Sequence, residues 1–192
     1  MEKSREYKIE IINFNVHKEE IIELRKQCWS NFHSKDLIKE EFYSQQDKIE
    51  DLASIHCGII ENNKLVATHR LQLINSIKQL PYSENFEPNT TIGSDWCTYK
   101  EENKEYVVMR PPVAATGRMV IHVDYRKKRI SEAILNFWIK TAREKGIKTL
   151  ISYPSPWMVK TLLKVGFRYE KKLKNVFKPL PSIDLALVTL KL

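Results

Sequence analysis

Hydrophobic and polar residues follow two periods along the first third of the chain. Tyr7–Asn13 alternates like a strand, and the residues after Asn15 place apolar side chains three and four positions apart, as on one side of a helix. Two strand-like runs, Ser54–Glu61 and Leu65–Ile74, are joined by Asn62-Asn63. Because asparagine tolerates positive φ, these runs predict a tight hairpin.

Two polar segments interrupt this pattern. Residues 31–46 space four apolar side chains like one side of a second, shorter helix. Residues 75–104 are rich in proline, serine, asparagine and threonine. A connection of this length is unusual inside a compact domain. We therefore interpret residues 75–105 as an insert, either functional in itself or built of short elements that the pattern does not resolve.

Strands and helices alternate in the second half, where Gly146 and Gly166 supply helix ends. The expected elements are strands at 106–109 and 113–123, a helix at 132–144, a strand at 147–153, a helix at 156–164, and strands at 167–177 and 183–192. The order β-α-α-β-β-β-α-β-α-β-β predicts an α/β fold, with helices on both faces of a mixed sheet. The length predicts a single domain over residues 1–192.

Composition limits the function classes. With 42% hydrophobic residues the chain can bury a core, and its net charge of +8 favours an acidic partner or a polyanionic ligand. Cys28, Cys57 and Cys97 are widely spaced, which is typical of free thiols in a reducing cytoplasm and offers no metal-binding cluster. No apolar run is long enough for a membrane span. The cations are scattered among acids rather than interleaved with aromatic residues, which argues against nucleic acid.

The strongest chemical signal lies in residues 117–131. An apolar strand is followed by a strongly basic turn and then by the start of a helix. The cations of this turn are Arg126, Lys127, Lys128 and Arg129. Backbone N–H groups and the positive end of the helix dipole meet there, which predicts a phosphate or pyrophosphate site. The alternative is a solvated run of charges.

The element order and this turn together resemble the GNAT superfamily of acyl-CoA N-acyltransferases. That family's pyrophosphate turn is Arg/Gln-x-x-Gly-x-Gly/Ala, and Arg129 and Ser131 stand here at the two glycine positions. Lys164-Val165-Gly166-Phe167 resembles the family's Lys-x-Gly-Phe helix end. The resemblance implies acyl-CoA or acetyl-CoA as co-substrate. The residues that it places along the cofactor are Ile121, His122, Val123, Arg126, Lys127, Lys128, Arg129, Ile130 and Ser131.

The first half resembles a narrower branch, the autoinducer synthases and N-acyl amino acid synthases. The matching residues are Arg25, Asp47, Asp51, the strand Ala67–Leu71, and Arg118. Ala115 stands where that branch has a glutamate. Arg70 and Arg118 are candidate substrate-binding residues, because arginine forks onto carboxylates; the alternative is that both point to solvent. The alternative for Asp47 and Asp51 is a solvated helix face or a helix cap.

Catalytic residues stay unassigned at this level. His122 is a candidate base and Tyr153 a candidate acid, with packing as the alternative for each. Many GNAT enzymes carry a tyrosine where Leu162 stands. We expect a cytoplasmic N-acyltransferase that acts on a small-molecule amine or an amino acid, with acyl-CoA or an acyl-carrier protein as donor. A degenerate, non-catalytic module that binds an acyl thioester or nucleic acid is the other hypothesis.

Overall fold

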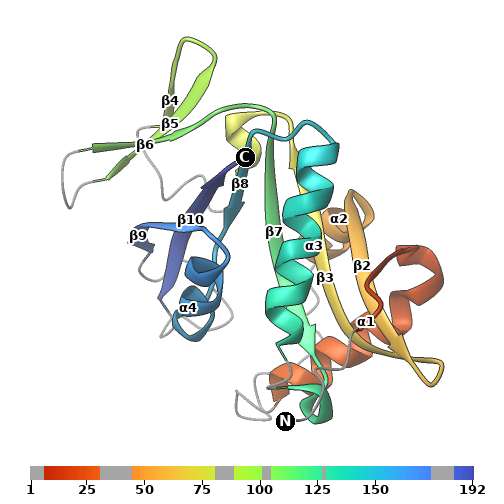
Figure 1. Ribbon diagram of the computed structural model, residues 1–192. Coiled ribbons are helices and arrows are strands. Elements are labelled where there is room, and N and C mark those ends of the chain that lie inside the picture. The colour runs from red at the N-terminus through yellow and green to blue at the C-terminus, as the bar shows by residue number, and fades with distance from the viewer. Residues whose placement is uncertain (1–6, 31–44, 81–88, 101–104, 127–128, 174–183) are drawn as a thin grey trace. The chain divides into compact units, whose positions relative to one another are not determined.

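The computed structural model describes six stretches of the chain (Figure 1). They are residues 7–30, 45–80, 89–100, 105–126, 129–173 and 184–192. The chain divides into two compact units, unit 1 from residues 1–72 and 118–137, and unit 2 from residues 73–117 and 138–192. Strand β7 (Val113–Ile121) and helix α3 (Ile130–Glu144) each pass from one unit into the other. The single domain expected from the length stays a prediction.

The elements follow the order predicted from the sequence, with two additional strands, β4 and β5, in the expected insert. In full they are β1 (Glu10–Ile12), α1 (Phe14–Ser30), α2 (Gln45–Leu52), β2 (Ser54–Glu61), β3 (Lys64–Ile74), the short 3-10 helix η3 (Ile77–Gln79), β4 (Asn89–Ile92), β5 (Asp95–Lys100), β6 (Glu105–Met109), β7, the 3-10 helix η5 (Val123–Tyr125), α3, β8 (Thr149–Ser152), α4 (Pro156–Lys164), β9 (Arg168–Leu173) and β10 (Leu185–Lys191). The mixed α/β fold class is confirmed.

Unit 1 contains the strand order β1-β2-β3-β7. The β2–β3 hairpin turns at Asn62 and Asn63 with φ of 50° and 60°, which confirms the expected turn. Helix α1 begins one residue before the expected cap, because the side chain of Asn13 accepts from the N–H of Asn15 and its carbonyl accepts from the next turn. Most of the second helix expected within residues 31–46 lies outside the described residues; α2 begins at Gln45.

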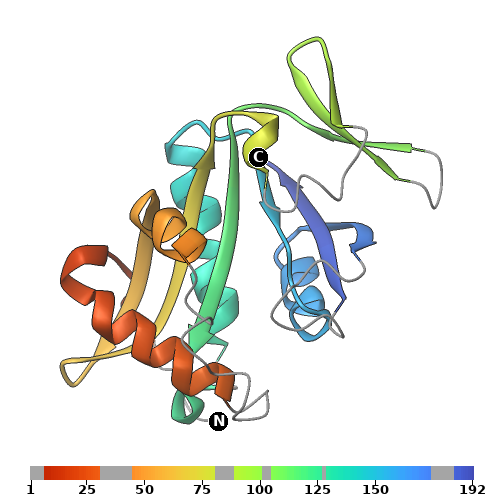
Figure 2. The ribbon, with the colours of Figure 1, turned by 180° about the vertical axis from the view of Figure 1, so that it is seen from behind.

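Helices α1 and α2 lie on one face of the unit 1 strands and the start of α3 lies on the other (Figures 1 and 2). The apolar side of α1 packs on β1, β3 and the end of β7. The buried residues of this core are Ile12, Phe14, Ile21, Leu24, Cys28, Leu65 and Val120. The packing fixes the last residues of β7, from which the bend before α3 begins.

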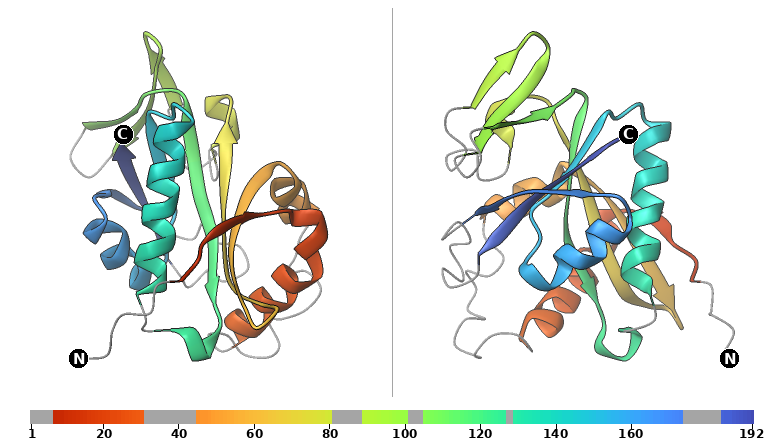
Figure 3. Two further views of the ribbon diagram at one scale, coloured as in Figure 1. Left: turned by 45° about the vertical axis from the view of Figure 1, so that its right-hand side comes forward. Right: turned by 60° about the vertical axis from the view of Figure 1, so that its left-hand side comes forward.

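In unit 2, β7 pairs in parallel with β8 from Val113↔Thr149 to Thr116↔Ser152. The Ser152 hydroxyl donates to the carbonyl of Thr116 at 3.1 Å. Past Ser152 the chain after β8 stays next to β10, where the N–H of Ala186 donates to the carbonyl of Pro154. Strand β7 continues for five residues beyond its last pair with β8. Helix α4 packs on β9 and β10 (Figure 3).

The insert forms its own three-stranded sheet in unit 2, in the order β4-β5-β6 (Figure 3). The sequence pattern had indicated only its last strand. The core of unit 2 joins this sheet to β7, β8, β9 and β10 through buried Val107, Met109, Val113, Ile151, Leu173 and Leu187. Within the described residues no helix is long and apolar enough to cross a bilayer, and no group of three or more side chains is arranged to hold a metal ion.

Candidate functional site

The bend that follows β7 is built from a single 3-10 turn. The N–H of His122, one residue past the end of β7, donates to the carbonyl of Val66 in β3 at 2.8 Å. The chain then turns through η5, where the N–H of Tyr125 donates to the carbonyl of His122 at 2.9 Å. Val123 is 53% exposed at this turn. The bend therefore presents its backbone at the surface of unit 1.

Two side chains hold the carbonyl of Ile121 at the end of β7. The Cys28 thiol donates to it at 3.2 Å and Arg126 Nε donates to it at 3.1 Å. Burial raises the pKa of Cys28, against the smaller opposing effect of Arg126. Cys28 is thus a neutral donor. These contacts anchor Arg126, the first cation of the turn, to the strand.

Arg129 occupies an unusual backbone conformation immediately before α3. Its φ of 58° lies in the left-handed region that favours glycine. Its side chain is 82% exposed and donates to Glu132 Oε2 from Nε at 3.1 Å and from Nη2 at 2.8 Å. The turn therefore keeps a glycine-type backbone although the residue is arginine, and its guanidinium lies at the mouth of the helix.

The first turn of α3 supplies further donors. Its first backbone bond runs from the N–H of Ala133 to the carbonyl of Arg129 at 3.1 Å, so the N–H groups of Ile130 and Ser131 precede the helical ladder. Ile130 is 2% exposed and fixes the start of the helix in the core. The predicted cations Lys127 and Lys128 lie outside the described residues.

A buried network of charged side chains joins α1, α2 and β3 in unit 1. Asp51 of α2 is fully buried and accepts from Arg25 Nη1 at 2.5 Å, from Arg25 Nη2 at 3.0 Å and from Arg70 Nη1 at 2.6 Å. Arg70 also pairs with Glu50. The expectation that Asp51 belongs to a solvated face or a cap is wrong, as is the alternative that Arg70 points to solvent, since Arg70 is 6% exposed.

Arg118 and Asp47 form a second, more accessible ion pair. The Arg118 side chain is 24% exposed and that of Asp47 is 10% exposed. Arg118 also has a φ of 57°, so the backbone of β7 is left-handed directly before the segment that leads to the bend. Left-handed non-glycine residues are uncommon inside strands and often lie at functional sites. At Gly117, beside it, a Cβ would meet no other atom within 4 Å.

Two buried histidines lie beside this network and stay neutral. Burial lowers the pKa of His69 to about 3, and the charge of Arg70 acts in the same direction. Burial also lowers the pKa of His56, against a weaker opposing effect of Asp51. The Nε2 of His56 lies 2.9 Å from the backbone carbonyl of Asp51, and its ring stacks on Phe14 at 4.8 Å. Because both histidines are neutral, the charges of the network and of the Arg118–Asp47 pair come from three arginines and three carboxylates, and they cancel.

The candidate catalytic residues lie in different units. His122 belongs to unit 1, where its ring is one third exposed, accepts weakly from the N–H of Asp124 at 3.4 Å and meets Tyr125 edge to face. Tyr153 belongs to unit 2 and packs against its core. Leu162 and Ala115 are both buried, and neither side chain has a polar atom that could take part in proton transfer.

Solved structures supply the comparison. No protein-family model matches the sequence, and neither does any curated protein. PaiA N-acetyltransferase from Thermoplasma acidophilum in complex with coenzyme A is 15% identical, with 98% of this chain and 100% of that chain covered and a TM-score of 0.63. An N-acetyltransferase from Staphylococcus aureus Mu50 is 15% identical, with 97% and 99% covered and a TM-score of 0.60. The ribosomal-protein-S18-alanine N-acetyltransferase from Escherichia coli is 12% identical, with 97% and 94% covered and a TM-score of 0.58.

The chain has the GNAT acyltransferase fold. At these identities the likeness establishes the fold alone. Arg129, which the sequence resemblance aligns with the first glycine of the family's turn, has a left-handed backbone in this structure. The narrower autoinducer-synthase resemblance has no support from these structures.

The turn and most residues of the charge network were visible in the sequence, but Glu50 and the contacts that join these residues were not. Glu50 carried no signal, because a lone glutamate in a polar helix is ordinary. The thiol contact of Cys28 links residues 93 positions apart in the chain and needs the fold to be seen. The positive φ of Arg118 leaves no trace in the sequence, since arginine is not a residue that marks such a conformation.

Proposed function

We propose that this protein is an N-acyltransferase that moves an acyl group from acyl-CoA to the amine of a small molecule or an amino acid. One observation carries the proposal: strand β7 ends in a cationic bend at the start of α3, with Arg129 in the backbone conformation of the missing glycine. Backbone N–H groups at a helix start, with cations beside them, suit a pyrophosphate.

The donor set fits coenzyme A. The N–H groups of Ile130 and Ser131 and the hydroxyl of Ser131 would hold the pyrophosphate. Arg126 and Arg129 would add charge; Arg129 would exchange its exposed contact with Glu132 for a phosphate at little cost, because exposed ion pairs contribute little. The segment Ile121–Val123 would lie along the pantetheine arm.

For the acceptor we assign Arg118 the direct contact. Arg70 is committed to Asp51 and Glu50, so its part is to hold those carboxylates in place. Arg118 and Asp47 form the accessible edge of the charged residues. An amino acid has the complementary pattern, since its carboxylate matches Arg118 and its ammonium matches Asp47. This pairing also supports, as a proposal, the resemblance to N-acyl amino acid synthases.

The chemistry needs few parts. The neutral amine attacks the thioester carbonyl and forms the C–N bond of a tetrahedral oxyanion. The oxyanion collapses as the C–S bond breaks; the nitrogen loses a proton to a base, and the thiolate takes a proton. Backbone N–H groups near the end of β7 would stabilise the oxyanion. His122, one third exposed at the bend, is our candidate to accept the proton from the ammonium group.

A non-catalytic thioester-binding module is the second candidate. Leu162 and Ala115 are buried apolar residues at the positions where relatives carry an acid and a carboxylate. Such a module would bind the same donor at the same bend and release no thiol. An acidic acyl-carrier protein in place of CoA would suit the net charge of +8.

Thermal shift with CoA, acetyl-CoA, a long-chain acyl-CoA and an acyl-carrier protein tests the donor, because a ligand that binds only the folded state raises the melting temperature. The variant Arg126→Ala/Arg129→Ala should lose most of the shift. The matched control Lys18→Ala/Lys26→Ala removes two exposed cations of α1 and should keep it. An equal shift in both variants would place the donor elsewhere.

Release of free thiol with a panel of amines then separates enzyme from module. Arg118→Gln should raise KM about tenfold or more for an amino acid, since a hydrogen bond to a charged group contributes about 1.5–3 kcal/mol. It should change KM little for the corresponding amine without a carboxylate. Binding of the donor without thiol release for any amine would favour the module.

A further inference from the structure

One long part of unit 2 carries no acidic residue. The chain has 24 aspartates and glutamates in 192 residues, yet none lies between Glu144 and Glu170. This stretch includes all of helix α4 and the first two residues of β9. The charged side chains that this stretch itself contributes are therefore all cations.

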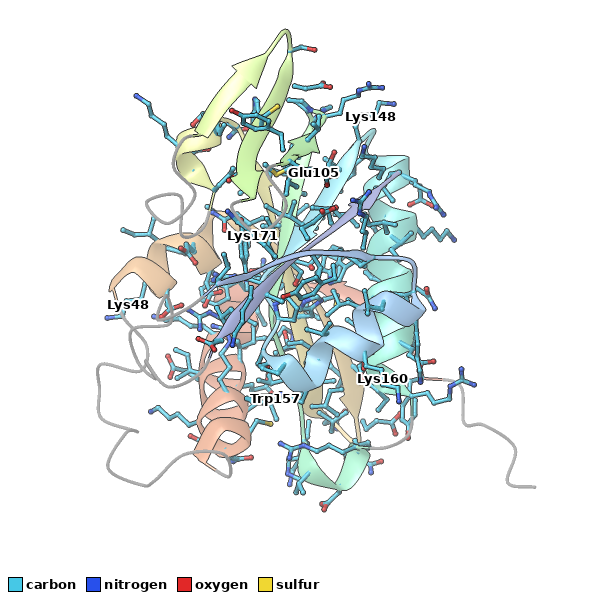
Figure 4. The ribbon with its side chains drawn as sticks, turned by 90° about the vertical axis from the view of Figure 1, so that its left-hand side faces the viewer. Lys48, Glu105, Lys148, Trp157, Lys160 and Lys171 are labelled. Atoms are coloured by element: carbon cyan, nitrogen blue, oxygen red, sulfur yellow. The ribbon has the colours of Figure 1, made fainter. Side chains whose placement is uncertain are left out.

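The exposed residues of α4 and the start of β9 combine these cations with large apolar side chains. Lys160, Lys164 and Arg168 are exposed, and Arg168 has only a loose contact of 3.7 Å with Glu170. Trp157 is 54% exposed, and Leu163 and Tyr169 are each 42% exposed. We call Trp157, Lys160, Leu163, Lys164 and Tyr169 the α4–β9 surface; Arg168 precedes Tyr169 in the strand and therefore points to the opposite face of the sheet. Figure 4 shows Trp157 and Lys160 on helix α4.

We propose that the α4–β9 surface binds the anionic face of a lipid bilayer. Lysine and arginine side chains reach lipid phosphates while their methylene stems lie on apolar surface. Tryptophan and tyrosine favour the boundary between headgroups and acyl chains. A helix of nine residues is too short to cross a bilayer and suits a position in the interface plane.

The mixture of residue types distinguishes lipid from the other polyanions. A purely electrostatic partner needs the cations but gives no reason to expose a tryptophan, a leucine and a tyrosine among them. A bilayer surface takes both, because its phosphates and its acyl chains lie within a few ångströms of each other. The proposal goes beyond acyl transfer and is independent of it.

Co-sedimentation with vesicles tests the proposal. We use vesicles of phosphatidylcholine alone and of equimolar phosphatidylcholine and phosphatidylglycerol. The protein should bind the anionic vesicles, and Trp157 emission should move to shorter wavelength as its ring leaves water. The variant Lys160→Gln/Lys164→Gln should lower the partition coefficient about thirtyfold, from the usual contribution of each cation at an anionic surface. The matched control Lys26→Gln/Lys64→Gln should lower it less than about threefold, because those cations lie elsewhere.

Trp157→Phe should remove the fluorescence change and keep most of the binding. Equal loss in the two lysine variants would show that net charge alone drives binding and would overturn the proposal. Absence of binding to anionic vesicles would also overturn it. A third result would overturn the proposal: an emission change of Trp157 on addition of an acyl-carrier protein but not on addition of vesicles. The surface would then bind an acidic protein. Thiol release in solution should be the same in all of these variants, which separates this proposal from the proposed reaction.

Discussion

Replacement of Asp51 by asparagine is the sharpest test of the buried network. Asp51 is fully buried and accepts from Arg25 and Arg70. Among the described residues Arg25 donates only to Asp51, so the Asp51→Asn variant leaves a buried guanidinium without a counter-charge. Loss of one partner from a buried ion pair typically costs about 3–5 kcal/mol. We expect a loss of this size in the free energy of unfolding.

The pH dependence of this loss follows from the pKa of Asp51. Burial alone would raise that pKa, but the hydrogen bonds and charges of Arg25 and Arg70 outweigh burial and lower it from 3.8 to about 2. The lowered pKa corresponds to roughly 2 kcal/mol of stability. Because the folded pKa lies below the unfolded one, this stability is present above pH 3.8 and is lost as the pH falls through about 2.

Urea denaturation of the wild type and of Asp51→Asn at neutral pH measures the difference. Glu19→Gln is the matched control, because it removes one carboxylate from the exposed side of α1 and should change the free energy of unfolding by less than about 0.5 kcal/mol. A loss below about 1 kcal/mol in Asp51→Asn, the range of exposed ion pairs, would refute the network. The difference between wild type and variant should narrow as the pH is lowered toward 2.

Three further predictions concern other parts of unit 1. Because the pKa of His69 is lowered to about 3, stability should fall as the pH drops below 6.5, by up to about 1.4 kcal/mol per pH unit, and urea titrations should show a shallower fall in His69→Gln. Arg129→Gly should keep the melting temperature, because glycine adopts its φ of 58° freely, whereas Arg129→Val should lower it by several degrees; equal effects would contradict the left-handed turn. Gly58→Ala should cost about 1–3 kcal/mol, since its Cβ would lie 2.7 Å from Leu65 Cδ1, and a neutral result would mean that the β2–β3 packing yields easily.

Short sequence patterns predicted most of the helices and strands. The Asn62-Asn63 turn, the end of α3 at Gly146 and the start of α4 at Pro156 were predictable, because each depends on the backbone preference of one or two residues. The sheet β4-β5-β6 was not. Its strand β4 (Asn89–Ile92) reads as polar turn sequence, and its pairing with β5 depends on contacts that no short window contains.

The candidate site divides in the same way. The cationic bend was visible because four cations are consecutive in the chain. The pairing of Arg25 with Asp51 was not, because the residues are 26 positions apart and exposed and buried charges look alike in a sequence. Burial depends on how α1 and α2 pack on the strands, so the pattern favoured a solvated helix face for Asp51.

The most direct test of the account is a titration of coenzyme A followed by backbone amide chemical shifts. We expect the largest changes at residues 119–126 and 129–132, with the change at Arg129 accompanied by loss of its contact with Glu132. The amides of the α4–β9 surface should keep their chemical shifts. Largest changes far from the bend between β7 and α3, or no saturable change at all, would contradict the claim that a pyrophosphate-bearing thioester binds there.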